Sequence, residues 1–326
     1  MNSPAAFTAA LAAAVPAPGE AVLSLVDLGT NSLRLDIVAL KGRSWRRLHR
    51  EKRMVRLGDG LFETGRLNPE AVDRVEDALA EFSQLHRALG GRKIAAVATA
   101  AMREAPEAAA LVDRWKEAFG IPFKVISGAE EAALIAKGVL AVEKAPSGPF
   151  GLIDIGGGST EVSLCQGTRV LESFSLPLGA NRAQQDFLKG TPPSPDGLKA
   201  LKERAAAAFK ELSKAHRWPA LRELIGSGGT VRSIRRIAKA SGAKEQPFTQ
   251  HFLSDLRGRA ELMNRLGLLH IPGMDEKRVD LFVAGCVILE EAALGLGAHR
   301  IRSTEASLRD GLLISEWELW PTDGRA

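Results

Sequence analysis

Two stretches of the chain, 127 residues apart, share a pattern that few folds accommodate. Leu25–Val38 reads LVDLGTNSLRLDIV, and Leu152–Cys165 reads LIDIGGGSTEVSLC. In both, an apolar run ends in an aspartate, a turn of small residues follows, and alternating apolar residues resume. The pattern predicts a β-hairpin with a tight turn in each stretch. Because the hairpins lie one domain length apart, we expect a tandem of two related domains.

The rest of the sequence alternates strand and helix patterns. Helical apolar spacing occurs at Pro69–Leu89, Glu107–Phe119, Pro195–Trp218, Asp275–Leu296 and Leu308–Trp317, and short apolar strands at Ile94–Thr99, Phe123–Ile126 and Leu221–Ile225. This alternation predicts an α/β fold whose sheets have a large parallel component and are covered on both faces.

The segment EKAPSGP, Glu143–Pro149, is rich in proline and glycine and precedes the second hairpin. We therefore place an N-terminal domain at residues 20–145 and a C-terminal domain at 146–326, with residues 1–19 as a loose tail that lacks the basic region of a signal peptide. No apolar run approaches the roughly 20 residues of a membrane span. Cys165 and Cys286 each lie in an apolar run, which predicts buried free thiols and a reducing, cytoplasmic compartment.

The net charge is +5, and much of the excess lies in Lys41–Arg56, KGRSWRRLHREKRMVR. This stretch is either a footprint for a polyanion or a solvated strand face with a basic bias. Trp45 is its only aromatic residue, which argues against a base-stacking surface and against nucleic acid as a partner.

The two turns have the composition of anion sites. A turn of this kind exposes backbone N–H groups, and glycine lets a phosphate approach without a Cβ in the way. The hydroxyls of Ser32, Ser159 and Thr160 add donors. Two such turns facing each other would hold a phosphate chain from both sides. The alternative is that each is a plain tight turn.

Carboxylates accompany both turns. Asp27, Asp154 and Glu161 supply the hard oxygen ligands that suit Mg²⁺, bound directly or through its waters. Such a metal would neutralise charge on a transferred phosphoryl group.

A third carboxylate set lies in VISGAEEAALIAKGVL, Val125–Leu140. Ser127 and Glu130 have the spacing of a capping box, which gives Glu130 a structural role. Glu131 has no such role, and beside an apolar surface its raised pKa would suit a general base for water. The alternative is a carboxylate that complements the helix dipole.

Two further motifs have both a functional and a structural interpretation. Arg103, in ATAAMREA, is either a bidentate phosphate ligand or a surface arginine early in a helix. The cluster IGSGGTVRSI, Ile225–Ile234, predicts a strand, a turn and a helix from Val231, but lacks a full dinucleotide-binding pattern. A P-loop motif does not occur in the sequence.

Taken together, these motifs resemble the exopolyphosphatase / guanosine pentaphosphate phosphohydrolase (Ppx/GppA) family. The resemblance runs from about Val22 to Leu313 and is carried, in order, by VDLGTNSLRL, VRLGDGL, ATAAMREA, VISGAEEAALIAKGV, LIDIGGGSTEVSL, SLPLGANR, IGSGGTVRSI, KRVDLFVAGCVIL and SLRDGLL. It implies two duplicated ribonuclease-H-like domains of the actin/sugar-kinase-like ATPase superfamily, with a cleft between them.

The resemblance also implies hydrolysis of a terminal phosphoanhydride bond, in polyphosphate or in pppGpp, with Mg²⁺ or another divalent cation; a requirement for K⁺ stays open. It places the base in the pair Glu130 and Glu131, of which we favour Glu131, and a second acidic site at Asp154 and Glu161. It implies phosphate contacts at Thr30, Asn31, Ser32, Arg103, Gly156, Gly157, Gly158, Ser159, Gly228, Gly229 and Thr230. A homodimer is the implied assembly, with no membrane or nucleic-acid partner.

Three alternatives to polyphosphate hydrolysis remain at this point. The substrate could be pppGpp, which presents the same terminal end. The chain could be an ATP-dependent phosphotransferase of the same superfamily, although Glu131 favours water as the acceptor. It could also be a non-enzymatic assembly module, which would leave Glu131 and Glu161 unexplained.

One residue departs from the pattern of the family that the chain resembles. Asn181, in SLPLGANR, stands where an apolar residue is commoner.

Overall fold

The computed structural model describes residues 15–42, 44–242 and 247–320, and the contacts of the chain divide it into two compact units. Unit 1 contains the described residues up to Ser127 together with those from Arg309 onward, and unit 2 runs from Gly128 to Leu308. Most of the expected loose tail, residues 1–19, lies outside the described residues. Within the described ranges, none of the helices is both long and apolar enough to cross a membrane.

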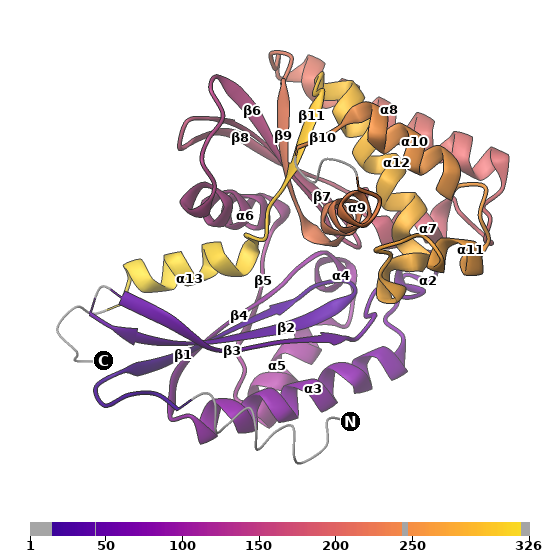
Figure 1. Ribbon diagram of the computed structural model, residues 1–326. Coiled ribbons are helices and arrows are strands. Elements are labelled where there is room, and N and C mark those ends of the chain that lie inside the picture. The colour runs from indigo at the N-terminus through magenta and orange to yellow at the C-terminus, as the bar shows by residue number, and fades with distance from the viewer. Residues whose placement is uncertain (1–14, 43, 243–246, 321–326) are drawn as a thin grey trace. The chain divides into compact units, whose positions relative to one another are not determined.

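Unit 1 is built on a five-stranded sheet with the order β3-β2-β1-β4-β5. The strands are β1 (Ala21–Leu28), β2 (Ser32–Lys41), β3 (Ser44–Met54), β4 (Gly91–Ala98) and β5 (Phe123–Val125). The first three form an antiparallel meander, and β4 and β5 run parallel to β1. Helices α3 (Pro69–Ala88) and α5 (Ala108–Phe119) cover one face and α13 (Leu308–Glu318) the other, as Figure 1 shows. The short helices α2 (Leu61–Thr64) and α4 (Ala100–Glu104) lie in the connections.

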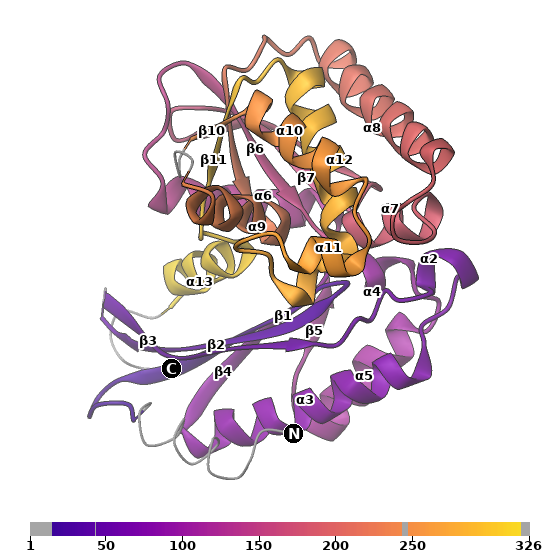
Figure 2. The same cartoon turned by 45° about the vertical axis from the view of Figure 1, so that its right-hand side comes forward.

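Unit 2 has a six-stranded sheet with the order β10-β11-β9-β6-β7-β8. Its strands are β6 (Pro149–Ile155), β7 (Thr160–Gln166), β8 (Arg169–Leu176), β9 (Glu223–Ser227), β10 (Phe248–Thr249) and β11 (Arg300–Ser303). Its helices are α6 (Gly128–Val142), α7 (Ala180–Asp186), α8 (Pro195–Ala215), α9 (Gly228–Ala240), α10 (Gln250–Ala260), α11 (Arg265–Leu269) and α12 (Val279–Leu296), with a 3₁₀ turn at Glu276–Arg278. Helix α12 packs against α7, α8 and α10 (Figure 2), whereas α6 packs against β7 and β8.

The two sheets share one topology, which confirms the duplication predicted from the hairpins. The order β3-β2-β1-β4-β5 corresponds strand for strand to β8-β7-β6-β9-β11, and β10 adds an antiparallel edge to the second sheet. This is the ribonuclease-H-like arrangement. The glycine cluster after β9 differs from expectation in one respect: α9 begins at Gly228 rather than at Val231, because the positive φ of Gly228 turns the chain directly from strand into helix.

In each unit, one face of the sheet is covered by a helix that comes directly after a strand of the other unit in the sequence. Helix α6 follows β5 in sequence but packs on the second sheet, and α13 follows β11 but joins unit 1. The expected boundary between residues 145 and 146 assigned α6 to the N-terminal domain, whereas the contacts group it with unit 2. The boundary at residue 146 is where the second copy of the repeat begins in the sequence. The contacts instead group α6 with the sheet on which it packs.

Strand alternation divides each hairpin into a core face and a second face. In β6, Ile153 and Ile155 belong to the large apolar core of unit 2, so Asp154 points to the opposite face. In β1, Val26 and Leu28 belong to the core of unit 1, so Asp27 points away from that core. The two aspartates therefore lie on the faces that α6 and α13 cover. Cys165 and Cys286 are buried free thiols, as predicted.

The basic stretch forms the edge strand β3, and its arginines are paired within unit 1. Arg46 bonds Glu20 at 2.7 Å, and Arg50 bonds Asp36 at 2.7 Å. Arg47 lies 3.1 Å from Asp36, and Arg53 pairs with both Glu51 and Glu81. These ion pairs favour the interpretation of the stretch as a strand face over a free polyanion footprint.

We expect Arg309→Ala to destabilise unit 1. Arg309 is 8% exposed and pairs with Asp36, which is 2% exposed, so its removal leaves a buried carboxylate without one of its partners. The expected cost is about 2 kcal/mol, measured as a shift of the urea midpoint. The control is Arg66→Ala, which removes an exposed pair with Glu107 and should cost less than about 1 kcal/mol. Equal shifts in the two variants would contradict a stabilising role for the buried pair.

Candidate active site

The tight turn of each hairpin is closed by the same hydrogen bond. The Gly29 N–H donates to the Ser32 carbonyl at 3.0 Å, and the Gly156 N–H donates to the Ser159 carbonyl at 2.9 Å. The positions correspond exactly in the aligned repeat, so the two turns fix the same strand register. Asp27 is thereby paired across the strands with Arg34, and Asp154 with Glu161.

In unit 2, the start of α7 holds the carbonyl groups of the turn. The Ala180 N–H donates to Gly156 at 2.9 Å, and the N–H groups of Asn181 and Arg182 donate to Gly157 at 2.9 and 3.0 Å. Unit 1 uses the segment after β3 in the same way, since Val55 and Arg56 donate to the Asn31 carbonyl. The VRLGDGL and SLPLGANR motifs therefore have a structural role, because their backbone N–H groups bind the carbonyl groups of the two turns.

The N–H groups of Gly157 and Gly158 donate no backbone hydrogen bond within the described part of the chain. With the carbonyls of the turn engaged by α7, these donors are the free side of the turn. A pair of N–H groups without backbone acceptors at the end of a sheet is typical of an anion site. N–H donors are therefore available at Gly157 and Gly158, whereas the Gly156 N–H is used within the turn, and phosphate contacts at these three glycines stay predictions.

Two other glycines permit close approach to this turn. A Cβ on Gly179 would lie 2.3 Å from the Gly157 carbonyl oxygen, and a Cβ on Gly228 would lie 2.5 Å from Oδ1 of Asp154. Gly228 also has φ +81°, which disfavours any side chain. The first turn of α9, with Gly228, Gly229 and Thr230, thus begins directly beside Asp154.

Three carboxylates form the acidic part of the site. Burial raises the pKa of Glu161 well above its usual value, and the charges of Glu131 and Asp154 raise it further. Hydrogen bonds from Ser159 and Ser175 act in the opposite direction, the latter at 2.8 Å. A buried like-charge set of this kind is typical of a functional site rather than of a stabilising one.

The structure separates the two glutamates of the EE pair. Glu131 is 8% exposed and Glu130 is exposed, and the charge of Glu131 acts on Glu161. Helix α6 comes close to β8 at its first residue, where a Cβ on Gly128 would lie 2.4 Å from the Ser175 Cβ. This approach places the first turn of α6, which carries Glu131, beside Ser175, the residue of β8 that pairs with Glu161. The role of either glutamate as a base remains a prediction.

Other polar residues around the turn have structural partners. The Ser227 hydroxyl donates to Asp154, and the Thr160 hydroxyl donates to the Leu178 carbonyl. Asn181 is buried, and its side-chain oxygen accepts a hydrogen bond from Gln185, which explains a polar residue at this position. Thr160 therefore braces the turn instead of adding a free hydroxyl donor to it.

In unit 1 the corresponding position is occupied by opposite charges. Asp27 lies 3.4 Å from Arg34 and 4.0 Å from Nε of Arg309. Burial lowers the pKa of Arg309 to about 10, against the opposing effect of Asp36. Two neighbouring guanidinium groups weigh against Asp27 as a ligand for Mg²⁺, and its predicted metal role stays a prediction.

The remaining predicted substrate residues of unit 1 are Thr30, Asn31, Ser32 and Arg103. The first three are buried in the turn, and Arg103 on α4 donates to the Ile126 carbonyl at 3.1 Å. That hydrogen bond gives Arg103 a structural contact between α4 and the end of β5. A phosphate contact by any of these four residues is not tested by the structure.

Within the described residues, no three His, Cys, Asp or Glu side chains form a ready metal cluster. Asp154 and Glu161 nevertheless suit Mg²⁺, which is commonly held by one or two carboxylates with waters and substrate phosphates completing its shell. The raised pKa of Glu161 reflects its burial and the charges of Glu131 and Asp154, and a metal held by Asp154 and Glu161 stays a prediction.

Sequence reasoning missed Ser175 and Ser227, which bond Glu161 and Asp154 respectively. The signal for Ser227 was present in GSGGT, since it is the last residue of a strand that runs parallel to β6. Ser175 lies in an ordinary strand sequence, and only the pairing of β8 with β7 identifies it.

Comparison with known proteins identifies the family of this chain. The model of the Ppx/GppA phosphatase family matches residues 37–319. The chain belongs to the Ppx/GppA phosphatase family. It is 29% identical over 305 residues to SCO0757, an uncharacterised protein of Streptomyces coelicolor, with 91% of each chain covered.

Two solved structures extend the family comparison. An exopolyphosphatase from Cytophaga hutchinsonii is 26% identical, with a TM-score of 0.83 over 92% of this chain and 99% of that one. The Ppx/GppA family member from Aquifex aeolicus is 23% identical, with a TM-score of 0.74 over 91% and 97% of the two chains. The second comparison supports the fold.

We expect Glu161→Gln to raise the melting temperature in metal-free buffer near neutral pH. Because the folded pKa of Glu161 is raised, its contribution to stability is fully present below the unfolded value and is lost as pH rises through the folded value. Removing the charge should then add about 3 °C or more, and the gain should shrink toward pH 5. The exposed Glu130→Gln serves as the control. A lower melting temperature at both pH values would contradict the like-charge interpretation.

Proposed function

We propose that this protein is an exopolyphosphatase, which hydrolyses the terminal phosphoanhydride bond of inorganic polyphosphate and releases orthophosphate. The observation that carries the proposal is the acidic set of Glu131, Glu161 and Asp154 beside the glycine turn of unit 2. A set of carboxylates next to an anion-binding turn supplies both a base for water and a place for a divalent cation. The similarity to the Cytophaga hutchinsonii exopolyphosphatase supports the choice of polyphosphate.

In this proposal the turn binds the terminal phosphate. The N–H groups of Gly157 and Gly158 and the first turn of α9, at Gly228, Gly229 and Thr230, offer donors to its oxygens. In unit 1, Thr30, Asn31, Ser32 and Arg103 are proposed as further phosphate contacts. These donors orient the phosphoryl group for in-line attack.

Glu131 then acts as the general base. Its carboxylate accepts a proton from water as the water oxygen attacks the terminal phosphorus, and the bridging P–O bond breaks. The products are orthophosphate and a chain shortened by one phosphate. Asp154 and Glu161 would hold a divalent cation, whose chemistry when bound is to offset negative charge on the phosphoryl oxygens.

A base at Glu131 also favours hydrolysis over phosphotransfer. A kinase must exclude water and position a substrate hydroxyl, whereas a buried carboxylate at the reacting group can activate water itself. pppGpp ends in the same terminal phosphoanhydride as polyphosphate, so it is the competing substrate within this mechanism.

The test is phosphate release in Mg²⁺ buffer from short polyphosphate, long polyphosphate, pppGpp and ATP. We expect release from polyphosphate at the highest kcat/KM. Phosphate release from pppGpp alone would mean that pppGpp, and not polyphosphate, is the substrate. If phosphate is released from none of the four substrates, the proposal that this chain is a phosphoanhydride hydrolase is wrong.

The pair Glu131→Gln and Glu130→Gln identifies the base. Glu131→Gln removes the buried carboxylate and should lower kcat by about 10²–10⁴-fold, because a general base contributes a factor of that size. The exposed neighbour should retain most of the activity, since it lies outside the buried set. The reverse order of effects would assign the base to Glu130.

A further inference from the structure

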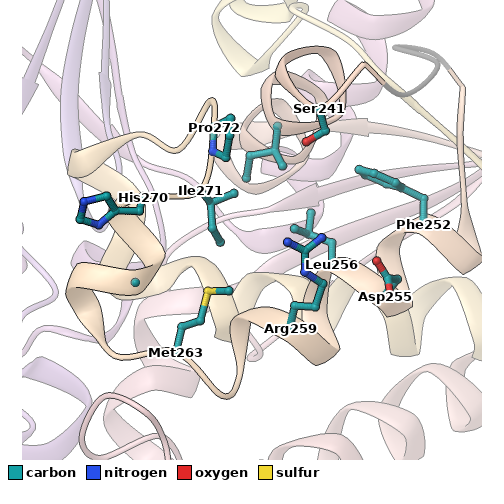
Figure 3. A pocket seen from close by; sticks show the side chains of 11 residues that line it. Ser241, Phe252, Asp255, Leu256, Arg259, Met263, His270, Ile271 and Pro272 are labelled. Atoms are coloured by element: carbon teal, nitrogen blue, oxygen red, sulfur yellow. The ribbon is translucent and has the colours of Figure 1, made fainter.

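A cavity lies on unit 2, formed by the C-terminal half of α9, by α10 and by the segment from α11 to Pro272 (Figure 3). Its volume is about 220 Å³. The lining residues of α9 begin at Ile237, nine residues beyond Gly228, or about 14 Å along the helix. The cavity is therefore separate from the glycine turn and from the acidic set.

One wall of the cavity is apolar. Ile237 and Leu256 are buried behind it, and Phe252, Met263 and Ile271 are half-buried along it. Figure 3 shows Leu256, Met263 and Ile271 around one space, with Phe252 at one end. An apolar wall with an aromatic ring at its edge accommodates a flat ring system, which can stack or pack against it.

Two charged residues, Asp255 and Arg259, lie at the exposed rim of the cavity. Asp255 and Arg259 lie one turn apart on α10, in the order that ordinarily gives an ion pair on a helix. Neither side chain forms an ion pair or hydrogen bond within the described residues, although both line the cavity. Arg257 on the same helix shows the contrast, because it pairs with Glu261 and Glu290.

We propose that this cavity binds a purine nucleotide. The base would pack against the apolar wall beside Phe252, and the Asp255 carboxylate would accept hydrogen bonds from the N–H groups of the base. The Arg259 guanidinium would bind the phosphate, for which its fork of donors is suited. The volume suits a base, and the exposed rim at Asp255 and Arg259 leaves the sugar and phosphate at the surface.

The three recognition elements belong together. An anion alone would make no use of the apolar wall, and a purely apolar ligand would make no use of the Asp255 and Arg259 charges at its rim. A molecule that combines a ring, N–H donors and a phosphate satisfies all three. The proposal does not depend on the hydrolase activity, since its residues lie outside the acidic set and its test measures binding.

The experiment is calorimetric titration of the full chain with AMP and GMP, and with adenosine and orthophosphate as partial ligands. We expect a purine nucleotide to bind, with each partial ligand at least about tenfold weaker. Arg259→Ala should weaken nucleotide binding by about tenfold or more, because it removes a charge-assisted contact. Met263→Trp should weaken it independently, by filling the apolar space with a larger side chain.

The matched control is Arg204→Ala, which removes an exposed arginine of α8 and should leave nucleotide binding unchanged. Thermal melts check that each variant is folded, and added tripolyphosphate checks for binding at the glycine turn instead. No nucleotide binding at millimolar concentration would overturn the proposal. Binding that tripolyphosphate displaces and that neither cavity variant weakens would also overturn it, as would equal affinity for orthophosphate alone.

Discussion

The register of the β6–β7 hairpin is the constraint on which the candidate site depends. The hydrogen bond from Gly156 to the Ser159 carbonyl closes the turn, and it sets Asp154 directly across from Glu161. Since side chains alternate along a strand, a slip of one residue would move both carboxylates into the apolar core. The glycines therefore do two things at once, because they expose N–H donors and hold the register that places the acids.

The same geometry in unit 1 produces a different electrostatic result. There the paired position across from Asp27 is Arg34, and the covering helix supplies Arg309, so the charges offset one another. In unit 2 the paired position is Glu161 and the covering helix supplies Glu131, so the charges repel. One duplicated scaffold thus contains a set of charges that offset one another and a set of like charges, and the proposed function places its chemistry at the second set.

The sequence predicted the parts of this structure that local patterns determine. The duplication, the two turns and the burial of Cys165 and Cys286 all follow from apolar spacing and glycine placement. The pairing of the basic strand was not predictable, because its partners Glu20, Asp36 and Asp310 are far from it in sequence or follow from strand register. The placement of α6 on the second sheet was also inaccessible, because its sequence shows an apolar face without showing which sheet that face covers.

The choice between two adjacent glutamates shows how packing completes what sequence leaves open. Neighbouring residues on a helix point about 100° apart, so only one of Glu130 and Glu131 can face the sheet. The rotation of α6 is limited by the contact of Gly128 with Ser175, where no larger residue fits without a shift of the chain. Ser175 in turn donates to Glu161. Ser175 on β8 therefore limits the rotation of α6, which carries Glu131, and also binds the Glu161 carboxylate. The geometry of the acidic set thus depends on how α6 packs on β8.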